Sequence, residues 1–90
     1  MKREPLYSSL AAAALDRLEA SDDGELFDAV RAAIDVVCDR GDSAGARREQ
    51  LRTASGTPVW KVPIRTRHDD WVLLWWPQDR DAYILFIGEL

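Results

Sequence analysis

The sequence predicts an α+β domain in which an N-terminal helical hairpin packs on one face of a three-stranded antiparallel sheet. Two observations lead to this class. Apolar residues recur at helical spacing through the first 40 residues, whereas residues 57–90 hold all four tryptophans in short apolar runs separated by polar turns. A chain of 90 residues can bury one core and is too short for a second, so residues 1–90 are expected to form a single domain.

The composition is ordinary for a soluble globular protein, with 47% hydrophobic and 31% charged residues. No apolar run approaches the roughly 18 residues that a membrane span requires, so we expect a cytoplasmic protein with no membrane role. The single Cys38 cannot form an internal disulfide, and one histidine with one cysteine offers no zinc-ligand spacing. Neither a metal nor another cofactor is expected.

The first helix is predicted near residues 6–19. Its alanine-rich run has high helix propensity, and Pro5 suits a first-turn position. Apolar residues recur at helical spacing: Leu6, Leu10, Ala14 or Leu15, and Leu18.

The second helix is predicted near residues 25–40. Asp22 can cap its N-terminus with Glu25 three residues later, in the arrangement of a capping box. Gly41 follows as a residue that readily ends a helix. Cys38 lies on the apolar stripe of this helix, where a buried small hydrophobic residue is more typical than a nucleophile.

Residues 43–54 form a basic connector whose structure the pattern leaves open. Ser43 can cap a short third helix with Leu51 as its only large apolar residue, and a partly irregular segment is the alternative. Strands are predicted near residues 58–64, 71–76 and 82–88. The predicted core consists of Leu10, Leu15, Phe27, Val30, Ile34, Trp60, Val62, Leu73 and Leu85.

The charge is unevenly distributed along the chain. Residues 40–67 hold seven basic and two acidic residues and so carry +5, which leaves −9 for the remainder of a chain whose net charge is −4. A basic segment can steer an anionic partner toward its binding site. The candidate nucleic-acid-binding residues are Arg47, Arg48, Arg52 and Arg67. A solvated helix face with a charged loop is the alternative, and the acidic pI of about 4.8 agrees with it.

Several motifs occur together in the second half of the chain. They are a basic connector ending in leucine (Arg47-Arg48-Glu49-Gln50-Leu51), a glycine before a strand with tryptophan (Gly56, Trp60), an aspartate-aromatic strand start with a later aromatic residue (Asp70-Trp71, Trp75), and a last strand ending in Gly88. With the order of elements, these motifs resemble the RelE/ParE toxin superfamily over about residues 6–88. The resemblance implies one RelE/ParE-like domain and a bacterial type II toxin, neutralised by a cognate antitoxin. RelE-like members cut messenger RNA on the ribosome and ParE-like members poison DNA gyrase.

Two departures from the family pattern bear on catalysis. Val72 stands where the family often has arginine, and Glu89-Leu90 stands where it often has His-Arg and a further tyrosine. A ribosome-dependent mRNA endonuclease would then rely on other groups. The candidates in the sheet region are Lys61, Arg65, Arg67, His68, Arg80 and Tyr83. Of these, His68 has the pKa for proton transfer, and Lys61 and Arg65 share a strand face suited to hold phosphate. A solvated turn histidine and the exposed face of an edge strand are the alternatives for these residues.

The tryptophans are candidate partner-binding residues: Trp71, Trp75 and Trp76. Two helices can cover only one sheet face, and successive strand residues point to opposite faces. One of two sets, Trp71-Leu73-Trp75 or Val72-Leu74-Trp76, must therefore point away from the helices. The connector and termini, an antitoxin segment or a second copy of the chain would cover it. A non-catalytic protein-interaction domain on the same scaffold is the alternative to a toxin.

Overall fold

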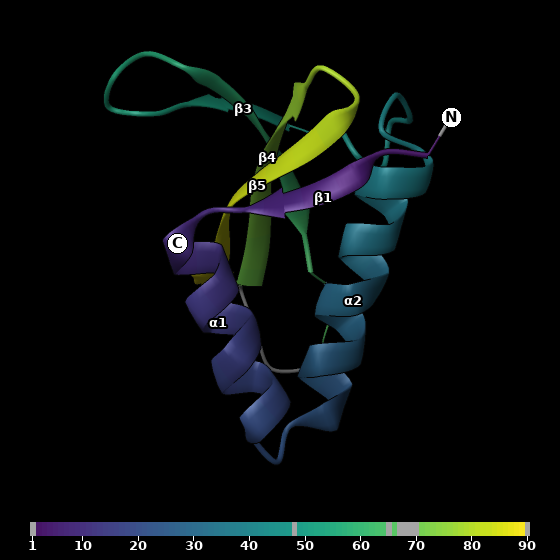
Figure 1. Cartoon of the computed structure of the whole chain (residues 1–90), viewed down its shortest axis with the longest axis vertical. Coiled ribbons are helices and arrows are strands. Elements are labelled where there is room, and N and C mark those ends of the chain that lie inside the picture. The colour runs from purple at the N-terminus through teal and green to yellow at the C-terminus, as the bar shows by residue number, and fades with distance from the viewer. Residues whose placement is uncertain (1, 48, 65, 67–70, 90) are drawn as a thin grey trace.

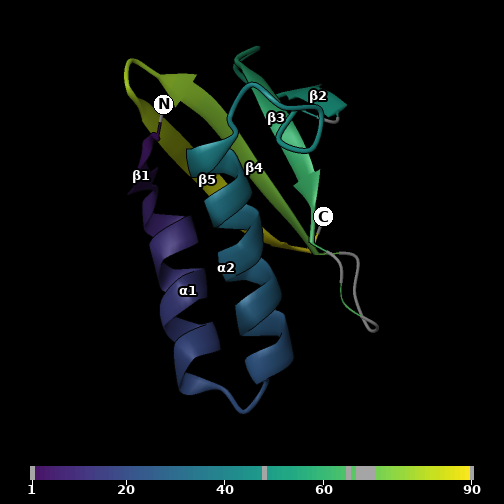
Figure 2. The ribbon, with the colours of Figure 1, turned by 90° about the vertical axis from the view of Figure 1, so that its right-hand side faces the viewer.

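The computed structural model of the chain describes residues 2–47, 49–64, 66 and 71–89. Two helices form one layer and a five-stranded sheet forms the other (Figures 1 and 2). The elements in chain order are β1 (Glu4–Tyr7), α1 (Ser9–Ala20), α2 (Gly24–Asp39), β2 (Glu49–Arg52), β3 (Pro58–Pro63), β4 (Trp71–Gln78) and β5 (Asp81–Glu89). Within the described ranges, no helix has the length and apolar character needed to cross a membrane.

The sheet is mixed and has the strand order β1-β5-β4-β3-β2. Strands β2 to β5 are antiparallel neighbours, whereas β1 runs parallel to β5 at the edge. The α+β class is therefore confirmed, and the predicted three-stranded antiparallel sheet is wrong. Both additional strands are only four residues long, so neither carries an alternation long enough to be recognised in the sequence.

The N-terminal residues differ from the prediction because Ser8, not Pro5, marks the start of α1. The Ser8 hydroxyl accepts a hydrogen bond of 3.1 Å from the backbone N–H of Ala11, which caps the helix. The same hydroxyl donates to the carbonyl oxygen of Leu85 at 2.5 Å, so the cap also fixes α1 to β5. Leu10 was predicted to be in the core and is 69% exposed instead, because the stripe that α1 buries consists of Ala11, Ala14 and Leu18.

The residue that caps α2 is Asp23, one position after the predicted Asp22. The carboxylate of Asp23, rather than that of Asp22, accepts a hydrogen bond of 3.1 Å from the N–H of Leu26. The buried stripe of α2 packs against α1 and the sheet. It consists of Leu26, Val30, Ala33, Ile34, Val37 and Cys38.

The basic connector contains turns and β2 instead of a third helix. Residues 41–47, which we now include in the connector, follow α2, and the Ala46 side chain is fully buried in the main core. Strand β2 then pairs with β3, so that Leu51 lies opposite Val59. Because β2 lies at the edge of the sheet, β3 pairs only with those backbone donors and acceptors of β2 that face it. Residues 49–52 alone could not have signalled this pairing.

Candidate binding face

Strand β4 separates the two apolar sets that the sequence left undecided. Trp71, Leu73 and Trp75 face α1 and α2, in the main core or packed against it. Val72, Leu74 and Trp76 point to the opposite side of the sheet and belong to a second, smaller cluster. The set that points away from the helices is therefore the second one.

We call the side of the sheet that faces away from α1 and α2 the open face. A row of side chains crosses all five strands on it, because Leu6 lies opposite Tyr83, Tyr83 opposite Trp76, and Val59 opposite Leu51. The pairing of Trp60 with Trp75 places Val59 in line with Trp76 and completes the row. The open face consists of Leu6, Leu51, Val59, Lys61, Val72, Leu74, Trp76, Tyr83, Leu85 and Phe86.

The open face is covered mainly by its own larger side chains. Val59, Val72 and Leu74 are buried beneath partly exposed neighbours, including Phe86 and Leu51. Among the described residues, neither helix lies on this side (Figure 2). The connector was expected to cover the apolar side chains that point away from the helices. It contributes only Leu51 from its described residues, and the aromatic side chains stay partly exposed.

Two local features determine the aromatic surface of the open face. The rings of Trp76 and Tyr83 stack with centroids 4.6 Å apart and an angle of 21° between their planes. A register shift next to Leu74 and Trp75 leaves Leu85 without a partner on β4, and both Leu85 and Phe86 then pack on the open face. The result is an apolar surface made from neighbouring strands.

The Lys61 ammonium, a predicted phosphate-holding group, lies on the open face in an ion pair. Its Nζ is 3.3 Å from a carboxylate oxygen of Glu49 on β2, and the Lys61 side chain is 27% exposed. The other two predicted catalytic residues, Arg65 and His68, lie outside the described residues. Their proposed roles remain predictions.

The predicted nucleic-acid-binding arginines occupy different environments. The Arg47 guanidinium lies over the Trp60 and Trp75 rings, 5.5 and 5.7 Å from their centroids, and donates to the Gly41 carbonyl at 2.7 Å. Arg52 is exposed and donates to the Gly56 carbonyl at 2.9 Å. Arg48 and Arg67 lie outside the described residues. Arg47 thus anchors the connector, whereas Arg52 remains accessible to a partner.

The predicted partner-binding tryptophans are likewise divided between the two sides of the sheet. Trp75 is fully buried on the helix side, and its indole Nε1 donates to the Ala46 carbonyl at 2.8 Å. Trp71 packs against the same core and is partly buried. Only Trp76 of the three lies on the open face, where Tyr83 and Phe86, which the sequence analysis did not assign to binding, accompany it.

Among the described residues, two side chains have clearly shifted pKa values, and both line the same pocket beside the helices. Burial raises the pKa of the Tyr7 hydroxyl above its usual 10.0. Burial, and then the carboxylate of Asp39, raises the pKa of the Cys38 thiol. A thiol with a raised pKa is a poor nucleophile, in agreement with the structural role predicted for Cys38. The described part of the chain contains no group of His, Cys, Asp and Glu side chains able to hold a metal ion.

Comparison of the chain with protein-family models, with curated proteins and with solved structures gave no match.

Proposed function

We propose that the chain is the toxin-like component of a bacterial type II toxin–antitoxin pair, which acts by binding a macromolecular target and is neutralised by an antitoxin. The observation that carries this proposal is the apolar cover of the open face, where five side chains are partly or fully exposed above the buried Val59, Val72 and Leu74: Leu6, Leu51, Trp76, Tyr83 and Phe86. Contiguous apolar surface of this kind is typical of sites for other macromolecules. The target would be the ribosome with its mRNA, or DNA gyrase.

The order of elements supports the toxin part of the proposal. Helices α1 and α2 are followed by antiparallel strands up to β5, and a helical pair before antiparallel strands is part of the resemblance to RelE/ParE toxins. Strands β1 and β2 are additions to the order on which that resemblance rested. The glycine at the end of β5, Gly88, is also part of that resemblance, and the packing around it explains why a larger residue would not fit there. A Cβ atom there would lie 3.0 Å from the ring of Phe86, so glycine lets that ring lie flat on the open face.

Binding explains the open face better than catalysis does. Lys61 is paired with Glu49, so its charge is already compensated where a phosphate would have to be held. The Tyr83 ring is engaged in stacking with Trp76. The same Lys61–Glu49 pair favours the second candidate, a non-catalytic protein-interaction domain on this scaffold.

Induced expression in a bacterial host without any partner gene tests the proposal. We expect the parent to arrest growth and Tyr83→Lys to lose this effect, because a charge in the middle of the apolar row opposes docking. Leu10→Lys is the matched control, since Leu10 is 69% exposed and belongs to α1. Thermal unfolding of both purified variants checks that each is folded.

The messenger RNA ends and the growth curve together separate the alternatives. Cleavage that appears with the parent and disappears with His68→Ala would establish a nuclease and overturn the binding mechanism. Growth arrest without cleavage would support a binding target. A parent without any effect on growth would reject the toxin and leave the interaction domain.

A further inference from the structure

Helices α1 and α2 diverge from their shared turn, and β1 crosses from one to the other at the wide end (Figure 1). A groove lies among the side chains of these three elements. We call this space the helix groove. It has a volume of about 450 Å³ and lies on the helical layer, remote from the open face. Its walls come from three elements: Lys2, Glu4, Pro5 and Tyr7 near or on β1, Ala12, Leu15, Asp16 and Glu19 on α1, and Phe27, Arg31, Ile34, Asp35 and Cys38 on α2.

The floor of the groove is apolar. Of the three residues that α1 buries in the main core, two are the small Ala11 and Ala14. Leu15 and Phe27 are partly exposed along the groove and pack at the edge of the core. An apolar floor of this kind, contributed by two helices, suits a third helix laid between them.

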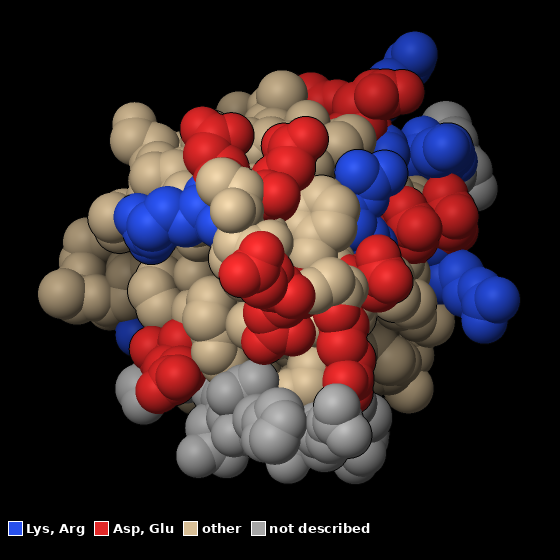
Figure 3. Space-filling model, turned by 90° about the horizontal axis from the view of Figure 1, so that it is seen from below, with Lys and Arg blue, Asp and Glu red and all other residues tan. Residues whose placement is uncertain are grey.

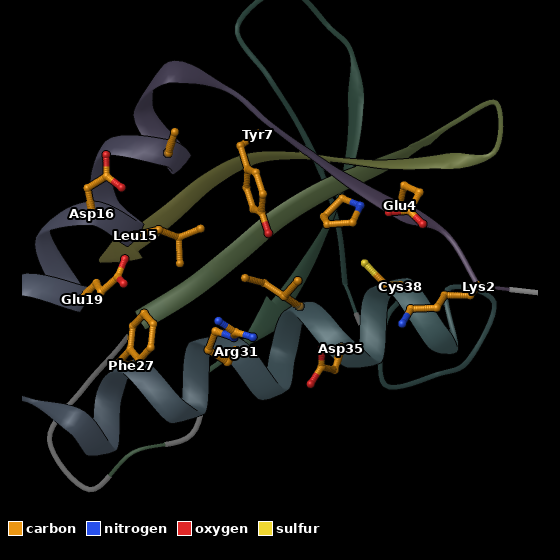
Figure 4. A pocket seen from close by; sticks show the side chains of 13 residues that line it. Lys2, Glu4, Tyr7, Leu15, Asp16, Glu19, Phe27, Arg31, Asp35 and Cys38 are labelled. Atoms are coloured by element: carbon orange, nitrogen blue, oxygen red, sulfur yellow. The ribbon is translucent and has the colours of Figure 1, made fainter.

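The rim of the groove is predominantly acidic. Figure 4 shows Asp16 and Glu19 on the α1 side, Asp35 on the α2 side, and Tyr7 pointing from β1 into the space between the helices. Four carboxylates line the groove, against the two cations Lys2 and Arg31. Arg31 is further engaged over the Phe27 ring at 5.8 Å.

The acidic character extends beyond the rim. Residues 4–39 contain nine carboxylate side chains and only two basic ones. Seen from the α1–α2 turn, acidic side chains are spread across the middle of the face among uncharged or undescribed residues, and most basic ones lie toward the periphery (Figure 3). A ligand attracted to this end of the molecule must therefore carry positive charge.

We propose that the helix groove binds a basic amphipathic helical segment of a partner protein. The apolar side chains of that segment would rest on Leu15, Phe27 and Ile34. Its lysines or arginines, one turn apart, would meet Asp16 and Glu19 on one rim and Asp35 on the other, since residues three and four apart share a helix face. The Tyr7 hydroxyl supplies one polar contact inside the groove. This proposal is independent of the toxin function, because it concerns a different surface.

A synthetic peptide tests the groove directly. The probe is a fluorescently labelled amphipathic helix of leucine and lysine, about 18 residues long to span the helix pair. A peptide of the same composition whose order abolishes amphipathicity is the control for charge alone. We expect the first peptide to bind the full chain at micromolar concentration in low salt and the second to bind at least about tenfold more weakly.

Charge reversal in the protein locates the binding site. Asp16→Lys/Glu19→Lys should weaken binding about tenfold or more, because two attractive contacts become repulsive. Asp22→Lys/Asp28→Lys is the matched control, since it changes the net charge equally at positions that do not line the groove. Amide chemical shifts of Leu15, Phe27 and Ile34 should move on titration.

Three outcomes would overturn the proposal. They are an amphipathic peptide that binds no better than its reordered control, two double variants that weaken binding equally, and shifted amides that lie on the open face. Each would show that general attraction to an acidic protein, or another surface, accounts for the binding. If Asp16→Lys/Glu19→Lys does not fold, Asp16→Asn/Glu19→Gln replaces it, with the same direction expected.

Discussion

The indole Nε1 of Trp75 donates a hydrogen bond of 2.8 Å to the carbonyl oxygen of Ala46, which lies 29 residues earlier in the chain. Both residues are fully buried. This bond fixes the connector to β4. This buried hydrogen bond is stabilising mainly because burial of either group without a partner would cost its desolvation free energy.

Replacement of Trp75 by phenylalanine should therefore destabilise the protein strongly. The Ala46 carbonyl loses its donor and the smaller ring leaves a cavity, so we expect a loss of about 2–3 kcal/mol in the free energy of unfolding. Urea denaturation measures it. Trp76→Phe is the control, since Trp76 is partly exposed on the open face. Equal losses in the two variants would contradict the importance of the Ala46 bond.

Arg47→Met should loosen the connector while keeping most of the side-chain volume. The variant loses the bond to the Gly41 carbonyl and the contacts with the Trp60 and Trp75 rings, which together account for about 1–2 kcal/mol. Loss of the ion pair with Asp42 adds little, because the Asp42 side chain is 89% exposed.

Limited proteolysis reads out the loosened connector, with cleavage expected within residues 41–47. Arg52→Met is the matched control because Arg52 is exposed and makes no ring contact in the described structure. If Arg52→Met were cleaved faster than Arg47→Met, the contacts of Arg47 would not be what holds the connector in place.

Two glycine-to-alanine changes should have opposite effects on stability. In Gly88→Ala the new methyl would lie 3.0 Å from the Phe86 ring, and moving that ring should cost about 1–3 kcal/mol. Gly24 begins α2, and a Cβ atom added there would meet no other atom within 4 Å, so Gly24→Ala should stabilise by about 0.5–1 kcal/mol. Thermal unfolding measures the stability change of each variant. A shift of the same sign in the two would show that the space around Gly88 and Gly24 does not decide these changes.

The stability of the protein should fall in alkaline solution partly through Cys38. Burial, reinforced by the carboxylates of Asp39 and Asp35, raises the pKa of this thiol above 9.0 in the folded state. The folded protein then retains the proton at a pH where the unfolded chain releases it. The stabilisation is fully present below the unfolded pKa and is lost as the pH rises toward the folded pKa.

The unfolding free energy of the parent should accordingly fall more steeply than that of Cys38→Ala between about pH 8 and pH 9.5. Tyr7 contributes in the same direction only as the pH passes 10.0, its usual pKa, so the lower window isolates the thiol. Slopes are compared instead of absolute values, because the substitution also removes packing. Parallel slopes would exclude a contribution from Cys38.

The helices and the three long strands were predictable because their signals are local. Helix α2 combines a cap with a continuous apolar stripe, and β4 is a long apolar run bounded by polar residues. The observed bounds of α2 and of the three long strands differ from the predicted ones by at most two residues. The start of α1 was misplaced by three residues, since the spacing of Leu6 and Leu10 imitates a helical stripe that the Ser8 cap interrupts.

The two edge strands were not predictable, because each depends on a partner elsewhere in the chain. Residues 4–7 become a strand only through β5, and residues 49–52 only through β3. The helix groove was missed for the same reason, since Tyr7 was assigned to a helix. The open face was predicted in part: the alternation along β4 required one apolar set to point away from the helices, but not which one.

The parallel pairing of β1 with β5 also constrains how the protein can be made. Synthesis on the ribosome proceeds from the N-terminus, yet residues 4–7 gain their hydrogen-bonding partners only when residues 81–84 have emerged. Contacts between such distant segments form late in folding because a long loop must close first. Leu6 cannot join Tyr83 before that point, so a nascent chain carries an incomplete open face until nearly the whole domain has been translated.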